Sequence, residues 1–164
     1  GPSRFEPDYR AATLVNSVLG QFGMMGRIGD EVREKRGLAY YAYSSMEGGM
    51  GPGAWSVSAG VNPANVQQAI DSIVGEIKRI VTEEVSDEDI NENKSYFTGH
   101  LPLQLESNEG LAGSILNMEA YKLGLDNLQR FEGEINALTK ADLLKAIQKY
   151  WNPEAYVVAV AGPQ

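Results

Sequence analysis

The spacing of hydrophobic positions changes from helical to strand-like within the first third of the chain. Residues 10–19 carry apolar side chains at helical spacing, which predicts an amphipathic helix that ends at Gly20. Residues 30–36 are mostly charged and predict a short helix that ends at Gly37. Residues 54–61 then alternate between apolar side chains and small or polar ones, which is the pattern of a strand with one buried face.

An aromatic-rich segment, residues 38–46, precedes this alternating strand. Residues 47–53, between the two, are rich in glycine and include a proline, which is typical of a turn. We therefore expect the two segments to pair as an antiparallel hairpin. The apolar face of its second strand consists of Trp55, Val57, Ala59 and Val61.

The chain then returns to helical spacing. An apolar stripe runs over residues 66–81, behind Asn62 and Pro63, which suit the cap and the first position of a helix. Three more helices are expected: one that begins at Ser86 and is kinked or broken near its middle by Pro102, one over residues 109–123 that ends before Gly124, and one from its cap Thr139 to Trp151.

The last β-branched run, residues 155–161, predicts a buried strand. Helices and strands are segregated along the sequence, so the expected fold class is α+β, with helices packed on one face of a mostly antiparallel sheet. We expect residues 1–164 to form a single domain. Three strands are few for so many helices, so we also expect a fragment that lacks an upstream strand and self-associates through the open sheet edge.

Composition removes several classes of function. The chain has no cysteine, which excludes disulfides, thiolate zinc sites and cysteine nucleophiles. Its 14 lysines and arginines against 22 aspartates and glutamates give a net charge of −8, so nucleic acid and acidic membrane surfaces are not expected as partners. No apolar run approaches the ~20 residues of a membrane span, and the first residues lack the layout of a signal peptide.

Three features that could carry chemistry fit structural roles better. The segment 20–29 has glycine at every third position, but this spacing differs from that of nucleotide-binding loops, and the segment follows a helix rather than a strand. His100 is the only histidine, so neither H-E-x-x-H nor H-x-x-E-H can occur, and we expect it at the surface or at the helix kink. A solvated helix N-terminus explains the acidic run better than a cation site does; the run is Asp87, Glu88 and Asp89.

One motif is specific: residues 33–40 read Arg-Glu-Lys-Arg-Gly-Leu-Ala-Tyr. This run resembles the "REKxGLAY" signature of the non-catalytic half of zinc metallopeptidases of the pitrilysin/insulysin and mitochondrial-processing-peptidase type. The resemblance extends over nearly the whole chain, through the order and spacing of the elements around the motif. It includes Pro7-Asp8-Tyr9 at the front and Asn152-Pro153-Glu154 before the last predicted strand.

The resemblance implies a division of labour between two homologous halves that close around a peptide. In the family, one half carries zinc on an inverted motif, H-x-x-E-H. The other half has no zinc ligands and contributes an arginine and a tyrosine spaced R-x6-Y, which here correspond to Arg33 and Tyr40. Arg36 and Tyr41 are near neighbours without this spacing. The resemblance thus implies no cofactor in this chain, zinc in a partner catalytic half of the same or another polypeptide, and a peptide as substrate.

The spacing also has a physical rationale. Arg33 in the last turn of a short helix and Tyr40 at the start of a strand, with Gly37 at the corner, can present two hydrogen-bond donors to one peptide carbonyl and stabilise an oxyanion. The structural alternative is that Arg33 pairs with Asp30 or Glu34 and that Tyr40 packs in the sheet.

Two functions therefore remain open. The first is a peptide-binding, non-catalytic half that completes the active site of a zinc-bearing partner. The second is a structural scaffold of the same fold, such as a core subunit without any role in peptide cleavage.

Overall fold

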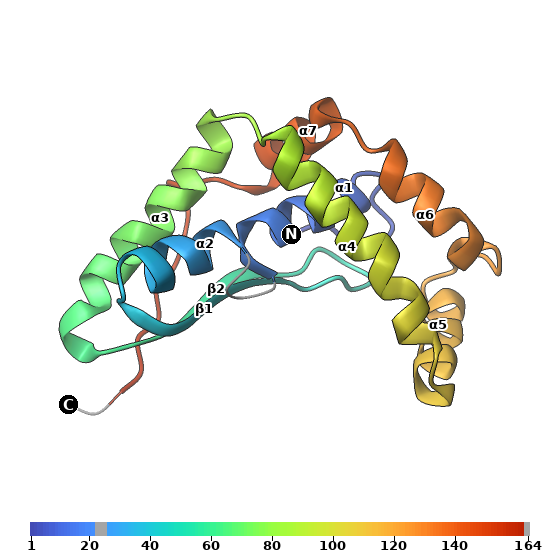
Figure 1. Ribbon diagram of the computed structural model, residues 1–164, viewed down its shortest axis with the longest axis horizontal. Coiled ribbons are helices and arrows are strands. Elements are labelled where there is room, and N and C mark those ends of the chain that lie inside the picture. Colours follow the sequence, from blue (N-terminus) through green and yellow to red (C-terminus); the bar gives the residue numbers. More distant parts are fainter. Residues whose placement is uncertain (22–25, 163–164) are drawn as a thin grey trace.

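The computed structural model describes residues 1–21 and 26–162, in which the helices gather on one side of a β-hairpin (Figure 1). This arrangement confirms the expected α+β class. In chain order the elements are α1 (Tyr9–Asn16), η1 (Ser17–Gln21), α2 (Arg27–Gly29), η3 (Asp30–Lys35), β1 (Ala39–Met46), β2 (Trp55–Val61), η4 (Pro63–Asn65), α3 (Val66–Thr82), α4 (Asp87–Leu105), α5 (Asn108–Ala120), α6 (Asn127–Ala137) and α7 (Lys140–Tyr150).

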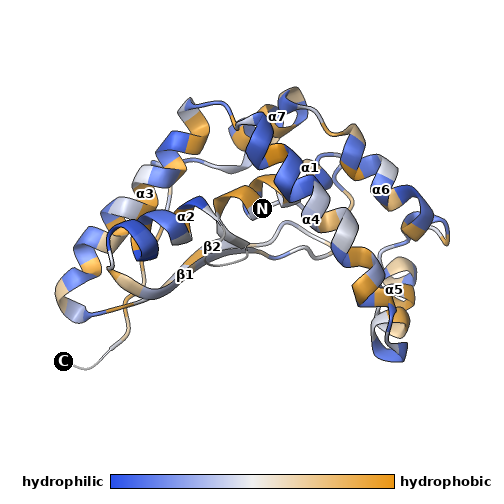
Figure 2. Ribbon diagram, viewed as in Figure 1, coloured by the Kyte–Doolittle hydropathy of each residue, from blue (hydrophilic) through white to orange (hydrophobic). Residues whose placement is uncertain are grey.

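The first helix, α1, lies at the centre of the molecule and is buried on more than one face. The apolar side predicted from sequence is buried, and so are Ala12 and the polar Asn16. The backbone of Gly20 leaves the helical region, which confirms this residue as the end of the helix. Figure 2 shows the resulting apolar centre, which is surrounded by helices with hydrophilic outer faces. The buried apolar side consists of Ala11, Leu14, Val15, Val18 and Leu19.

The hairpin presents its apolar face to this helix. β1 and β2 pair antiparallel, with Ala42 opposite Ala59 and Met46 opposite Trp55. The alternating residues of β2 pack against the core, as their spacing predicted. The Trp55 ring meets that of Trp151 edge-on, with 5.8 Å between the centroids, so the end of α7 closes over the same face.

The helix caps also confirm the sequence analysis. The side chain of Asn62 accepts a hydrogen bond from the Ala64 amide, and that of Ser86 accepts one from Asp89. At the start of α7, Thr139 accepts a hydrogen bond from the Asp142 amide, and the carboxylate of Asp142 accepts one from the Thr139 amide.

Three expectations from the sequence need correction. Residues 155–161 are not a strand: they form no ladder, and Val157 is 96% exposed. The cause is the lack of a pairing partner, because a strand needs a neighbour as well as β-branched side chains. Pro102 does not break its helix near the middle, since α4 continues through it for one more turn to Leu105. Helix α6 was not predicted.

The described sheet has two strands, and the absence of an upstream strand stays a prediction. Self-association through an open edge stays a prediction. None of the helices in residues 1–21 and 26–162 is long and apolar enough to cross a membrane.

We predict that Thr139→Ala lowers the free energy of unfolding by about 1 kcal/mol, because it removes the capping hydrogen bond of α7. Urea denaturation of the purified chain measures the change. Thr82→Ala is the matched control: the Thr82 hydroxyl donates only to carbonyls of its own helix, and we expect a change within about 0.5 kcal/mol. Equal losses in the two variants would contradict the role of the cap.

Candidate functional site

Arg33 lies in the last turn of the short helix that α2 and η3 form together. Two buried side chains, Ile28 and Val32, hold the inner side of this helix against the core. The Arg33 side chain keeps 34% of its surface exposed, and its Nε lies 3.6 Å from a carboxylate oxygen of Glu34. This separation is too long for a strong hydrogen bond, so the guanidinium is only loosely paired. One partner of the structural alternative, Glu34, is thus observed.

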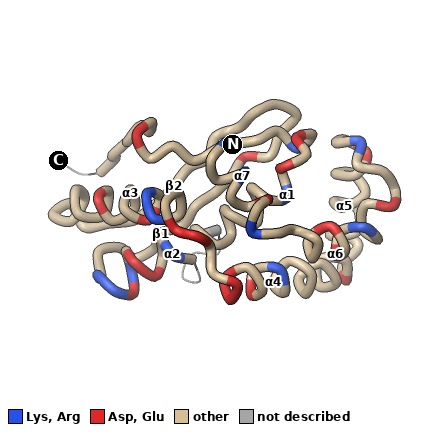
Figure 3. The backbone as a smooth tube through the Cα atoms, turned by 90° about the horizontal axis from the view of Figure 1, so that it is seen from above, with Lys and Arg blue, Asp and Glu red and all other residues tan. Residues whose placement is uncertain are grey.

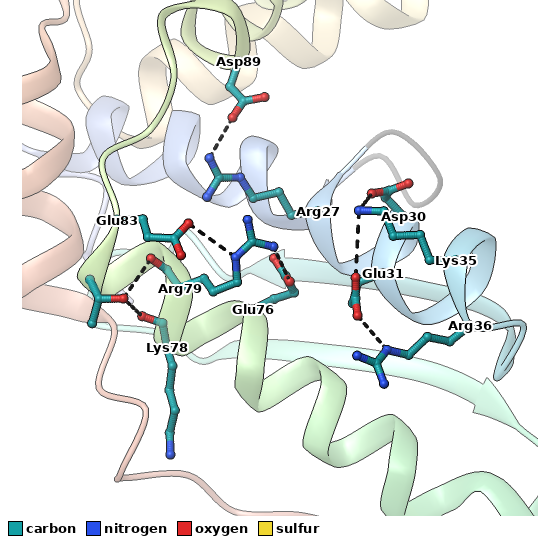
Figure 4. A network of polar contacts seen from close by, with 11 residues as sticks. Arg27, Asp30, Glu31, Lys35, Arg36, Glu76, Lys78, Arg79, Glu83 and Asp89 are labelled. Carbon is teal, nitrogen blue, oxygen red and sulfur yellow. Dashed lines mark hydrogen bonds and ion pairs between the residues drawn. The ribbon is translucent and has the colours of Figure 1, made fainter.

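The other charges of this helix are engaged more tightly (Figure 4). Arg36 donates to Glu31 at 2.6 Å, so its guanidinium is occupied. Lys35 lies 2.7 Å from Asp30, and the hydrogen bond and charge of that carboxylate raise the pKa of the Lys35 ammonium. Among the basic residues of η3, Arg33 is therefore the one whose charge has the weakest partner.

Helix α3 supports the same region from beside η3. Glu76 of α3 is 3% exposed and accepts a hydrogen bond from Arg79 at 2.8 Å, and this buried carboxylate raises the pKa of Arg79. At the other end, Arg27 donates to Asp89 of α4 at 2.7 Å. Figure 4 shows the Glu76–Arg79 pair within α3 and the Arg27–Asp89 pair between α2 and α4. The second pair ties the start of the helix that carries Arg33 to α4.

Gly37 makes the corner between η3 and β1. Its backbone has φ +61°, a conformation that glycine adopts without steric cost. The Gly37 amide donates to the Arg33 carbonyl and the Leu38 amide to the Val32 carbonyl, both at 2.9 Å. Leu38 is buried. The helix stop predicted from sequence is thus confirmed, and β1 begins two residues after this corner, at Ala39.

Tyr40 sits at a β-bulge, which the sequence analysis did not predict. Ala39 pairs with Val61 and Tyr41 pairs with Gly60, so Tyr40 is an extra residue without a partner on β2. Bulges change the direction of a side chain and are common beside active sites. The Tyr40 side chain is 84% exposed and has no hydrogen-bond partner within the described residues.

The neighbouring tyrosine is held in place instead. A Cβ atom added to Gly60 would lie 2.5 Å from the ring of Tyr41, so this ring covers the glycine. The centroids of the Tyr41 and Tyr43 rings are 5.8 Å apart on the same outer face of the hairpin. Neither hydroxyl has a hydrogen-bond partner among the described residues, but the Tyr41 ring rests on Gly60, whereas Tyr40 is 84% exposed and does not pack in the sheet.

Arg33 and Tyr40 come from adjoining elements, and both reach solvent. The described residues include no hydrogen bond between them, and their donors are therefore available to a ligand. A guanidinium and a phenol can donate to a carbonyl oxygen and hold the negative charge that develops on it.

The described residues form no metal-binding site. No group of three or more histidine or carboxylate side chains is arranged to hold an ion there. His100 is exposed and stacks on Tyr96 at 5.4 Å between the centroids. The acidic start of α4 is used in ion pairs, with Asp87 near Lys140 and Asp89 near Arg27. Of the glycine-rich segment 20–29, residues 22–25 lie outside the described part of the chain.

Comparison with known proteins places the residues of this site in a known domain family. A family model of the Peptidase M16 inactive domain matches residues 1–97, a range that contains both Arg33 and Tyr40. The chain belongs to the Peptidase M16 inactive domain family. This assignment confirms the resemblance that the segment 33–40 indicated.

Three relatives of this M16 domain illustrate the family. The chain is 27% identical, over 88% of its length, to a "Probable inactive metalloprotease YmfF" of Bacillus subtilis, and 32% identical, over 70%, to an "Uncharacterized zinc protease SCO5738" of Streptomyces coelicolor. It covers 33% and 25% of these two proteins. A crystal structure of the peptidase M16 inactive domain from Pseudomonas fluorescens has a TM-score of 0.85 and 26% identity, with 93% of this chain and 36% of that chain covered.

We predict that Gly37→Ala destabilises the domain by about 1–2 kcal/mol, because an L side chain at this left-handed position is strained. A Cβ at Gly37 would meet no atom within 4 Å, so the backbone conformation alone causes the loss. Gly75→Ala is the control: a Cβ there is also free of contacts, but the position lies inside α3, and alanine should stabilise the domain by about 0.5–1 kcal/mol. Thermal or urea unfolding measures the change in stability. A change of the same sign in both variants would contradict the requirement for a left-handed backbone at Gly37.

Proposed function

We propose that this M16 inactive domain is the non-catalytic half of a zinc metallopeptidase, in which it binds a peptide and completes the active site of a zinc-bearing half. The observation that carries the proposal is the β-bulge at Tyr40, which leaves its phenol hydroxyl free on the element that follows the weakly paired Arg33.

The two side chains would act on the carbonyl of the peptide bond to be cleaved. As a nucleophile adds to the carbonyl carbon, negative charge collects on its oxygen, and donors already in place stabilise it without reorganisation. Arg33 would supply a permanent charge and Tyr40 a neutral donor. The corner at Gly37 fixes both of them on adjoining, packed elements, which is the preorganisation that such donors require.

The zinc ion belongs to the other half in this proposal. The donor set of the described residues does not fit one, because His100 has no second histidine and no carboxylate cluster beside it. The partner half, in the same polypeptide or on another subunit, would hold the metal and supply the activated water. The peptide itself could be held along an edge of the hairpin through backbone hydrogen bonds, a mode with little sequence demand.

The second candidate is a structural scaffold. The observation in its favour is the ion pair between Arg33 and Glu34, since it gives the arginine a surface role that needs no substrate. The B. subtilis relative also carries the word "inactive" in its name. The two candidates differ in one measurable quantity, the effect of Arg33 and Tyr40 on the rate of peptide cleavage.

We predict that Tyr40→Phe and Arg33→Ala, in the complete protein with its zinc-bearing half, each lower kcat/KM about 10²–10³-fold, largely through kcat. Both side chains reach solvent, so the unfolding midpoint should stay unchanged. Tyr43→Phe and Arg36→Ala are the matched controls. Tyr43 lies on the outer face of the same strand, and Arg36 lies near the end of the same helix. Both control variants should cleave the peptide at the wild-type rate. Wild-type rates in all four variants would support the scaffold.

We also predict that the chain alone retains well under one zinc ion after dialysis and cleaves no peptide, since tight zinc sites use three or four protein ligands that usually include histidine. Elemental analysis of the purified chain measures the metal content. A stoichiometric metal, or peptide cleavage that survives chelators, would overturn the proposed division of labour.

A further inference from the structure

We infer that a pocket between α1, α4, α6 and the N-terminal segment binds the C-terminal residue of a peptide, with its carboxylate on Arg4 and its side chain among aromatic rings. The cavity has a volume of about 350 Å³. This is at the lower end of the range for ligand pockets and suits one or two amino-acid residues. Figure 1 shows α1, α4 and α6, the three helices whose residues line it.

Aromatic side chains from separate elements form the walls. Tyr9 contributes from α1, Phe97 and His100 from α4, and Phe131 from α6. The His100 ring stacks on Tyr96, with 11° between the planes, so its edge is oriented by a second ring that also lines the pocket. A large apolar or aromatic side chain would replace water against these surfaces, which is the usual source of affinity in such pockets.

Positive charge at the mouth of the pocket is not fully compensated. Arg10 pairs with Glu134 and donates to Asn127, and Arg130, which shares Glu134, also pairs with Asp126. Arg4 has no carboxylate partner in the described part of the chain; its guanidinium lies over the rings of Tyr9 and Tyr121, 5.4 and 4.6 Å from their centroids.

Arg4 is nevertheless held in position. Its backbone amide donates to the Gly49 carbonyl at 2.9 Å, which ties the N-terminal segment to the hairpin loop. Burial, together with the nearby charges of Arg130 and Arg4, lowers the pKa of Arg10, against the influence of Glu134. An anion between Arg4 and Arg10 would relieve this repulsion, and Gln104 and His100 add polar groups on the same wall.

A C-terminal residue matches this combination because it carries a carboxylate and a side chain on one Cα atom. An acidic side chain within a peptide would bring the charge without the apolar body that the rings require. The identification of the ligand as a peptide rests on the proposed function. The site does not, because it shares no residue with the Arg33–Tyr40 pair.

The test is a calorimetric titration of the chain with acetyl-Ala-Ala-Phe, as the free acid and as the C-terminal amide. We expect the acid to bind at least tenfold more tightly than the amide, because a charge-assisted hydrogen bond is lost in the amide. Arg4→Gln should remove this difference and Arg4→Lys should retain part of it. Arg36→Gln, which changes an arginine outside the pocket, should leave it unchanged.

Three results would overturn the inference: no saturable binding, equal binding of acid and amide, or an Arg4→Gln variant that still prefers the acid. Binding of 3-phenylpropionate as tight as that of the peptide acid would assign the pocket to small aromatic acids and refute the peptide. The Tyr40→Phe variant should bind like the wild type. If the chain does not bind the peptide acid but Arg33 and Tyr40 affect cleavage as predicted, only the pocket is refuted. If the chain binds the acid but those two residues do not affect cleavage, only the proposed function is refuted.

Discussion

The burial of α1 is the constraint on which the rest of the structure depends. A helix with more than one apolar face cannot lie on the surface, so the hairpin must cover one side and α7 another. One polar residue, Asn16, is buried with it, and its carbonyl groups accept hydrogen bonds from Ser44 and Trp55 of the two strands. These bonds fix how the hairpin is placed on the helix, because an unpaired amide in this core would cost about 1–3 kcal/mol.

The candidate site follows from how the chain leaves this core. Val32 and Leu38 are both buried, and the corner at Gly37 joins them across the reversal from helix to strand. Arg33 lies between the two anchored residues with its side chain partly in solvent, and Tyr40, at the bulge two residues after Leu38, is exposed. Arg33 and Tyr40 are therefore exposed because their neighbours are anchored, which gives two flexible donors a rigid base.

Features that depend on a few neighbouring residues, such as helix caps and the corner at Gly37, could be predicted from the sequence. The corner at Gly37 follows from one glycine after a charged helix, and the caps follow from single polar residues. The bulge was missed although Ala39 and Ala42 both face the core. Inward residues of a regular strand are two apart, so a spacing of three requires one extra residue between them. Only the pairing with β2 shows that this extra residue is Tyr40. Residues 155–161 were misjudged because a strand needs a partner. Pro102 was taken to break its helix near the middle, but α4 ends at Leu105, so this proline lies in its last turns.

The charge distribution indicates that direct contacts, rather than long-range electrostatic attraction, would select the ligands of this chain. The net charge of −8 repels anions, but over no more than about 10 Å at moderate salt. Basic and acidic residues are interspersed along the backbone (Figure 3), and most cations of the site region, such as Arg36, are neutralised by an adjacent carboxylate. A guanidinium that is loosely paired, as in Arg33, or without a carboxylate, as in Arg4, then has a local effect on a neutral carbonyl or a single carboxylate. Ligands would thus be distinguished by where their oxygens lie, a requirement that a rigid corner and an aromatic pocket can each meet.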